Sequence, residues 1–364
     1  MSFQSVLAEH RLQSSSESEK GSRFERMMQG YLKTDPMYSN RFSAVWLWSE
    51  FPYREQFGGS DLGIDLVCFT HDEEYWAVQC KCYAEDTVME KGAVDSFLAT
   101  SSKRFRNEKR EEVGFSHRLW ISTSDKWGKN AETSLENQNP PVSRISLADL
   151  ENSAVDWDKL NAGIFGQHAR LEKKTLLPHQ NTAVERVLAH FADHDRGKLI
   201  MACGTGKTFT SLKIAEQLCA EKKKGLVLVL VPSIALIGQT LREWTANCDT
   251  RIAPICICSD ATASRLGDEY GGKVVDLALP ASTDTQKIVK QLQHALYNDP
   301  LVDMVVLFST YQSIEVVAEV QKQMQFTLDL IVCDEAHRTT GVTLKDDVGK
   351  DESAFVRVHD DTFL

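Results

Sequence analysis

The chain has 364 residues, enough for two ordinary domains, and its 42% apolar and 26% charged content is typical of a globular protein. Its formal net charge of −11 excludes a uniformly basic nucleic-acid coat protein but allows a local basic groove. The polar amino terminus lacks a signal-peptide core and the apolar runs have only strand length. We therefore expect a cytoplasmic protein with no membrane contact.

Nine cysteines raise the question of disulfides or a metal site. Most of them lie in or beside apolar runs, and the two Cys-x-Cys pairs have no second pair or histidine at zinc spacing. This placement favours buried free thiols in a reducing compartment.

The first half of the chain predicts a mixture of helices and strands. Residues 1–20 begin as a helix that a Ser/Glu-rich stretch interrupts, and residues 22–32 show helical spacing. Residues 61–69 and 75–83 flank a turn and predict a β-hairpin. Further strands are expected at 42–48, 118–123 and 142–146, and a helix at 92–100.

Four polar residues of this half form a candidate metal-dependent site. Asp65 closes one strand of the expected hairpin, and Gln79 and Lys81 lie two apart on the other, so they share a face. An acid would hold Mg²⁺ against a phosphate, and a lysine would stabilise charge or position the attacking water. Glu25, on the preceding helix, could complete the oxygen shell. Asp61 is a second candidate for the metal-binding acid.

Residues 103–110 form a basic run that could lie along DNA phosphates. Basic runs of this kind are more often a solvated face, and neighbouring glutamates dilute the charge of this one. Both interpretations remain open.

The second half alternates apolar runs with helical stretches. After a segment at 151–170 without a clear strand, strands are expected at 226–232, 305–309 and 328–333, with helices between them. Such alternation predicts a parallel sheet covered by helices on both faces.

The stretch 198–208 predicts a nucleotide-binding P-loop. An apolar start indicates a short buried strand, which a Gly-rich turn and a helix follow. Glycines let backbone N–H groups point at one phosphate, and the helix start adds its positive dipole end. The residues that would cradle phosphates and Mg²⁺ are Gly204, Thr205, Gly206, Lys207 and Thr208. The strict pattern asks for glycine at position 201, where this chain has Met201. The alternative is a Gly-rich turn with an incidental lysine.

A second acidic motif follows the apolar run 328–333. Asp334 would complete the Mg²⁺ sphere, and Glu335 would orient or deprotonate the attacking water. His337 could link this site to moving segments. Two acids at the carboxyl end of a parallel strand stand where such sheets bind ligands.

With these motifs, the half from about residue 171 resembles the first RecA-like lobe of superfamily 2 helicases and translocases. The resemblance implies that Gln180, beside His179, reads adenine and that ATP is the cofactor together with Mg²⁺. It also implies backbone contacts to DNA from residues in 231–240 and 309–313, namely Ser233, Thr240, Thr310 and Gln312. No motif of a second lobe follows His337, so we expect a part of a longer protein that binds ATP but turns it over poorly.

The pattern of residues 63–66 followed by 79–81 resembles the Mrr-like branch of the PD-(D/E)xK nucleases, which commonly carries glutamine in place of an acid. Glu25 matches its upstream glutamate. The two halves together resemble the type ISP restriction–modification enzymes, which implies duplex DNA as substrate, ATP-driven translocation, and methyltransferase and target-recognition parts elsewhere.

We therefore expect an α/β protein with a restriction-endonuclease-like mixed-sheet domain at 1–155, a linker at 156–172 and a RecA-like parallel-sheet lobe at 173–364. The expected function is ATP-dependent DNA cleavage. Two alternatives are a repair-type helicase whose first domain binds DNA without cutting it, and an ATP-switched scaffold.

Overall fold

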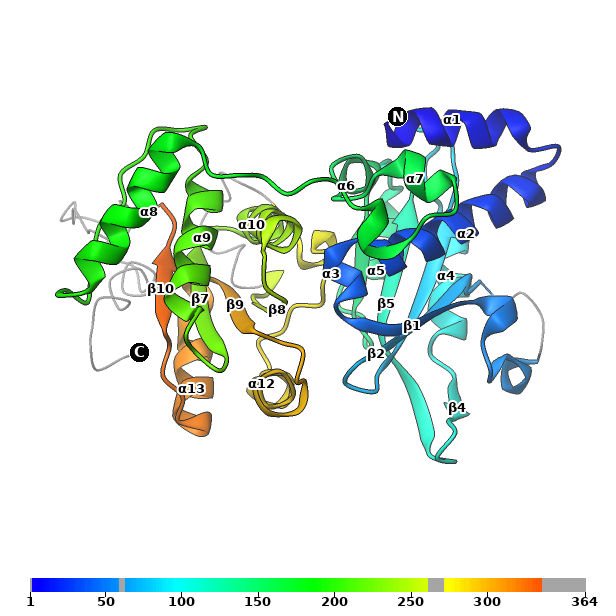
Figure 1. Ribbon diagram of the computed structural model, residues 1–364. Helices are drawn as coiled ribbons and strands as arrows, with labels where there is room; N and C mark the ends of the chain where they lie inside the picture. The colour runs from blue at the N-terminus through cyan, green and yellow to red at the C-terminus, as the bar shows by residue number, and fades with distance from the viewer. Residues whose placement is uncertain (1, 59–62, 261–271, 336–364) are drawn as a thin grey trace, which may run out of the picture. The chain divides into compact units, whose positions relative to one another are not determined.

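The computed structural model describes residues 2–58, 63–260 and 272–335. Its contacts divide the chain into two compact units, which are coloured along the chain in Figure 1. The first unit consists of residues 1–172 and a short second segment, Val275–Pro280. The second unit consists of residues 173–274 and 281–364.

The first unit is built on a mixed sheet. Its strands run in the order β1-β2-β3-β5-β4, and β6 pairs with the other edge of β5. The pairs β3–β5 and β5–β6 are parallel, and the remaining pairs are antiparallel. This confirms the expected fold class and the β2–β3 hairpin. The bounds are β1 Phe42–Leu47, β2 Leu66–Thr70, β3 Tyr75–Lys81, β4 Arg104–Arg106, β5 Glu112–Ser122 and β6 Val142–Ile145.

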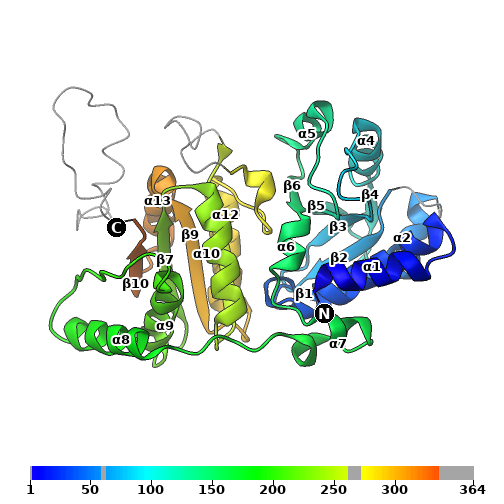
Figure 2. The same cartoon turned by 90° about the horizontal axis from the view of Figure 1, so that it is seen from above.

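Helices cover both faces of this sheet, with α4 and α5 on one side and α1 and α2 on the other (Figure 2). The side chain of Phe97, on α4, packs edge-on to Trp120 of β5 with ring centroids 5.9 Å apart. Both side chains are fully buried, so this contact anchors the core under α4. The helices are α1 Phe3–Gln13, α2 Glu17–Thr34, α3 Pro36–Ser39, α4 Lys91–Thr100, α5 Lys129–Leu135, α6 Leu147–Glu151 and α7 Trp157–Asn161, with 3₁₀ turns η1 Trp48–Glu50, η2 Arg54–Phe57 and η3 Gly166–Ala169.

Two expectations about local order differ from the structure. The Ser/Glu-rich stretch is a helix start, because the Ser16 hydroxyl accepts the backbone N–H of Glu19 and caps α2. Residues 156–172, expected as a linker, contain α7 and η3. Trp157 stacks on Tyr31 of α2 at 5.6 Å and contacts Phe3 of α1 at 4.6 Å, so burial of these rings fixes the segment to the first unit.

The second unit is built on an all-parallel sheet in the order β10-β7-β9-β8. Every residue of β7 and β9 is buried, as expected for strands covered on both faces. The strands are β7 Gly225–Val231, β8 Ile252–Ile257, β9 Met304–Thr310 and β10 Leu330–Cys333. The helices are α8 Pro178–Phe191, α9 Lys207–Cys219, α10 Ile234–Asn247, α12 Thr285–Gln293 and α13 Ile314–Met324, with short turns η6 His294–Asn298 and η7 Tyr311–Ser313. The turn η5 Val274–Asp276 leads from this unit into the second segment of the first unit.

The prediction of a buried strand before the P-loop was wrong. Residues 198–202 have no regular structure, and Ile200 is 91% exposed. Among the described residues β10 pairs only with β7, so its other edge has no strand beside it. An apolar run becomes a strand only when its backbone finds a ladder partner, and here residues 198–202 do not pair with that edge.

None of the helices in the described ranges has the length and apolar character needed to cross a bilayer. All nine cysteines are free thiols, as expected, and six of them are buried. The expectation of burial is wrong for Cys203, which is exposed, and Cys82 and Cys333 are only partly buried.

Candidate active sites

In the first unit, Asp65 lies directly before β2, where the β2–β3 ladder begins. Its backbone N–H donates to the carbonyl of Val78 at 2.9 Å. Its carboxylate Oδ2 accepts the backbone N–H of Cys80 at 2.6 Å, and the side chain is only 8% exposed. A buried carboxylate that accepts a backbone N–H is held in one orientation, so the hairpin presents Asp65 as a fixed acid.

Gln79 is buried beside this acid and donates its Nε2 amide to the same Oδ2. Its Oε1 therefore points elsewhere, toward Gly63, where an added Cβ would lie 3.4 Å from it. Gly63 has φ +85°, and the same Cβ would be 3.0 Å from Ser96 Oγ, so this approach requires glycine. Coordination through the amide oxygen requires turning the amide over, which leaves the side chain's position unchanged.

Lys81 ends β3 on the same face as Gln79, and Cys80 points to the other face. Burial raises the pKa of the Cys80 thiol well above its ordinary value. The negative charges of Asp65 and Glu25 raise it further, while the Lys81 ammonium lowers it. The hydrogen bond from the Cys80 N–H holds the Asp65 carboxylate beside the residue that precedes Lys81, whereas Glu25 acts electrostatically on the thiol, which lies on the opposite face of β3.

Within the described ranges, no three or more His, Cys, Asp and Glu side chains are arranged to hold a metal ion. The candidate set contains two acids, Asp65 and Glu25, and would take its third ligand from the Gln79 amide. Mg²⁺ prefers carboxylate and amide oxygens as ligands, so the oxygen atoms of the candidate side chains are of the right chemical type for this ion. Asp61, the second candidate acid, lies outside the described residues.

In the second unit, the P-loop turns into α9 through two glycines in the left-handed region, Gly204 at φ +75° and Gly206 at φ +84°. Gly206 is the N-cap of α9, so Lys207 and Thr208 stand in the first turn, where backbone N–H groups are unpaired. An added Cβ on Gly206 would lie 2.4 Å from Gln180 Nε2, which again requires glycine. A helix start of this local geometry is suited to an anion.

The two nucleotide motifs meet in the structure. Lys207 Nζ lies 4.0 Å from Glu335 Oε1, and both side chains are about one-third exposed, at 37% and 33%. Asp334 follows β10, and its carbonyl accepts the hydroxyl of the buried Tyr311 at 2.8 Å. Burial raises the pKa of Asp334, while the Glu335 backbone N–H and the Lys207 charge act in the opposite direction. His337 lies outside the described residues.

Gln180 contacts the P-loop directly. Its Nε2 donates to the Thr205 carbonyl at 2.9 Å, and its Oε1 accepts the Leu177 N–H at 2.9 Å. The ring of His179 also contacts the Thr205 carbonyl at 3.2 Å. Both ends of the Gln180 amide are thus in use, and reading adenine would require exchanging at least one of these bonds.

The four residues expected to contact DNA in this unit are mostly covered. Ser233 caps α10 by accepting the Leu236 N–H at 3.3 Å, and Thr310 contacts the Ser313 hydroxyl at 3.2 Å. These two and Thr240 are at most 5% exposed. Gln312 is half-buried, and its Oε1 has no hydrogen-bond partner among the described residues.

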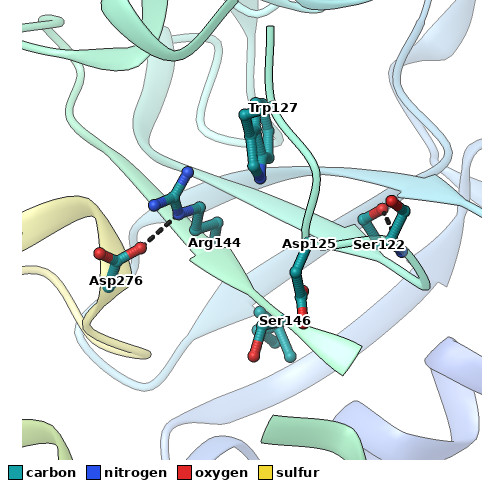
Figure 3. A pocket seen from close by; sticks show the side chains of 8 residues that line it. Ser122, Asp125, Trp127, Arg144, Ser146 and Asp276 are labelled. Carbon is teal, nitrogen blue, oxygen red and sulfur yellow. Dashed lines mark hydrogen bonds and ion pairs between the residues drawn. The ribbon is translucent and has the colours of Figure 1, made fainter. Parts of the chain in front are cut away.

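No sequence pattern predicted the cluster at the carboxyl ends of β5 and β6, which Figure 3 shows. Arg144, from β6, lies over the ring of Trp127 at 5.1 Å and pairs with Asp276. Asp276 is 132 positions away in the sequence, so no local pattern could have connected them.

Comparison with known proteins agrees with this division. A family described as "Restriction endonuclease" matches residues 33–165, and one described as "Type III restriction enzyme, res subunit" matches residues 173–348. A solved structure, the ATP-dependent type ISP restriction–modification enzyme LlaBIII bound to DNA, matches with 34% identity and a TM-score of 0.80 over 99% of this chain. The chain belongs to the type ISP restriction–modification enzymes.

This type ISP chain spans 21% of the LlaBIII chain. A second type ISP structure, a nuclease-deletion mutant of LlaGI in complex with a DNA substrate mimic, is 46% identical over 52% of this chain and 16% of its own length, with a TM-score of 0.43. The search of curated proteins found no match. The first unit is therefore a Mrr-like nuclease domain and the second a helicase-type domain.

Proposed function

We propose that the first unit hydrolyses phosphodiester bonds of double-stranded DNA with Mg²⁺, and that the second binds and hydrolyses ATP to drive translocation along duplex DNA within a type ISP enzyme. The observation that carries the nuclease proposal is the fixed Asp65 carboxylate, which accepts hydrogen bonds from the Gln79 amide and from the N–H of Cys80, the residue before Lys81.

Each residue has a distinct task in this proposal. Asp65, Glu25 and, through its oxygen, Gln79 would hold Mg²⁺, which when bound supplies positive charge beside the scissile phosphate. The backbone N–H of Cys80 keeps the Asp65 carboxylate oriented. Lys81 places its ammonium beside the phosphate, where it stabilises developing negative charge and orients the attacking water.

The second unit would bind ATP at the P-loop. The N–H groups at the start of α9 and the Lys207 ammonium would hold the phosphates, and Thr208 and Asp334 would hold their Mg²⁺. Glu335, 4.0 Å from Lys207, would orient the attacking water. Gln180 and His337 are proposed for the same site, and Ser233, Thr240, Thr310 and Gln312 for the DNA backbone.

The nuclease proposal is tested by Asp65→Ala in the enzyme that contains this chain, incubated with plasmid DNA, Mg²⁺ and ATP. We expect cleavage to fall by at least about 100-fold, because a fixed electrostatic contact to the reacting phosphate is lost. ATP binding should not change. Asp95→Ala, which removes an exposed acid of α4, is the matched control and should cleave normally. Unchanged cleavage by Asp65→Ala would refute the assignment.

DNA binding without cleavage is the second candidate function, because the site contains only two acids. It predicts that the unmodified enzyme leaves the plasmid intact at every Mg²⁺ concentration while still binding it.

A further inference from the structure

Arg144 shares a row of the sheet with the proposed cleavage site. It is the register partner of Trp120, and Trp120 is the register partner of Gln79. Side chains at paired positions of a parallel ladder lie on the same face. Adjacent strands are about 4.8 Å apart, so the Cα atoms of Gln79 and Arg144 are separated by about 10 Å. That separation spans about three phosphates of one DNA strand along the helix axis.

The guanidinium of Arg144 is held in place by its neighbours, but one of its nitrogens has no hydrogen-bond acceptor among the described residues. It lies over the Trp127 ring, pairs with Asp276, and is 3.6 Å from the Glu132 carboxylate. Its Nη1 is buried and makes no hydrogen bond within the described part of the chain. The pocket beside it is lined by Ser122, Trp127 and Asp276 among others (Figure 3). An arginine held over an aromatic ring with a spare donor is suited to a phosphate.

Asp276, the partner of Arg144, lies on the short second segment of the first unit, Val275–Pro280. Val275 of this segment joins the aromatic core cluster, and the Tyr38 hydroxyl donates to the Ala278 carbonyl at 3.2 Å. Asp276 itself stays 40% exposed. The residues that flank this segment, 274 and 281, belong to the second unit. One of the two acids that pair with Arg144 is thus supplied by a segment continuous with the second half of the chain, and the other, Glu132, belongs to α5.

We propose that Arg144 binds a DNA phosphate a few nucleotides from the scissile one, and that Asp276 occupies its guanidinium until the phosphate replaces the carboxylate. The exchange is chemically matched, because carboxylate and phosphate present similar pairs of oxygens to the guanidinium fork. The inference rests on the proposed nuclease function. It adds a DNA-positioning residue and an acid that competes with DNA for it.

The test measures binding of a short fluorescent duplex to the full chain by anisotropy, in EDTA so that cleavage plays no part. Asp276→Asn should bind about tenfold more tightly at low salt, the worth of one charge-assisted contact. The slope of log affinity against log salt should steepen by about one. The double variant Arg144→Gln/Asp276→Asn should lose this gain. Asp276→Glu, which keeps the charge, should show none.

Glu73→Gln is the matched charge control, because it frees Lys109, a cation of the β4–β5 hairpin paired at 2.7 Å. An equal gain from this variant would show a mere effect of net charge and overturn the proposal. A gain that persists without Arg144 would overturn it as well. If Asp276→Asn unfolds the first unit, the single variant Arg144→Gln tests the proposal instead, and its affinity for the duplex should fall by about tenfold. The nuclease proposal is tested separately by the Asp65→Ala cleavage assay, so its failure can be distinguished from failure of this binding test.

Discussion

The two candidate sites differ in how completely their surroundings hold them. In the first unit, Asp65 is 8% exposed and accepts hydrogen bonds from Gln79 and Cys80, which adjacent ladder positions fix. In the second, Lys207 and Glu335 are about one-third exposed and meet at 4.0 Å. Glu335 follows β10, an edge strand with one described neighbour, and Lys207 follows residues 198–202, which form no strand.

This contrast teaches that a site built on paired strands is assembled by the fold itself. A site built on turns needs its flanking strand, or its ligand, to complete it. In the P-loop, the N–H groups of the first turn of α9 have no intrahelical acceptor, and phosphate oxygens are the natural partner. We therefore expect ligand binding to order the second site and to change the first very little.

The largest expected effect is the loss of ATP binding in Lys207→Ala. Removing a charge-assisted contact to the phosphates should weaken binding by about 100-fold. Titration with a fluorescent ATP analogue measures this loss, and Lys223→Ala, an exposed lysine of the same unit, is the control. If the two variants bind equally, Lys207 does not contact the nucleotide and the second site has been misplaced.

A pair of apolar substitutions sharpens the comparison through stability. Phe97→Ala opens a cavity in the first unit and should lower its free energy of unfolding by about 3–5 kcal/mol. Ile200→Ser, at a 91% exposed position, should cost less than about 0.5 kcal/mol. Denaturant unfolding followed separately for each unit gives both values. A loss of several kcal/mol from Ile200→Ser would mean that residues 198–202 form a buried strand in solution.

A smaller effect, specific to the first unit, concerns pH. Burial raises the pKa of Asp35 from 3.8 to about 6, against the lowering effect of the Met37 and Ala154 N–H groups and of Arg170. The folded state then holds this proton more tightly than the unfolded state. The free energy of unfolding should therefore fall as pH rises from about 4 to 6, by up to about 3 kcal/mol.

Asp35→Asn keeps an acceptor for the Met37 N–H and removes the titrating group. Urea unfolding at pH 4.5, 5.5 and 6.5 should show a flatter dependence for this variant, while Asp95→Asn should keep the original slope. An unchanged slope in Asp35→Asn would assign the pH dependence to other groups.

Much of the candidate chemistry could be predicted because it resides in short motifs. The Gly204–Thr208 turn dictates its own geometry through two glycines, and the hairpin of β2 and β3 brings Asp65 to Gln79 through local pairing alone. For the same reason the parallel sheet of the second unit followed from its alternating apolar runs. Glu25 could be proposed but not placed, since helix packing rather than spacing brings it toward the thiol of Cys80.

The sequence by itself determined which residues are equipped for phosphate and metal chemistry and the strands that carry most of them. Only the tertiary structure decided which apolar runs find partners. It left residues 198–202 without a ladder and packed 156–172 onto α1 and α2. It also joined Asp276 to Arg144 across 132 positions. The physical reason is that hydrogen-bond partners and buried neighbours are supplied by distant segments, whereas turn geometry and side-chain chemistry are local.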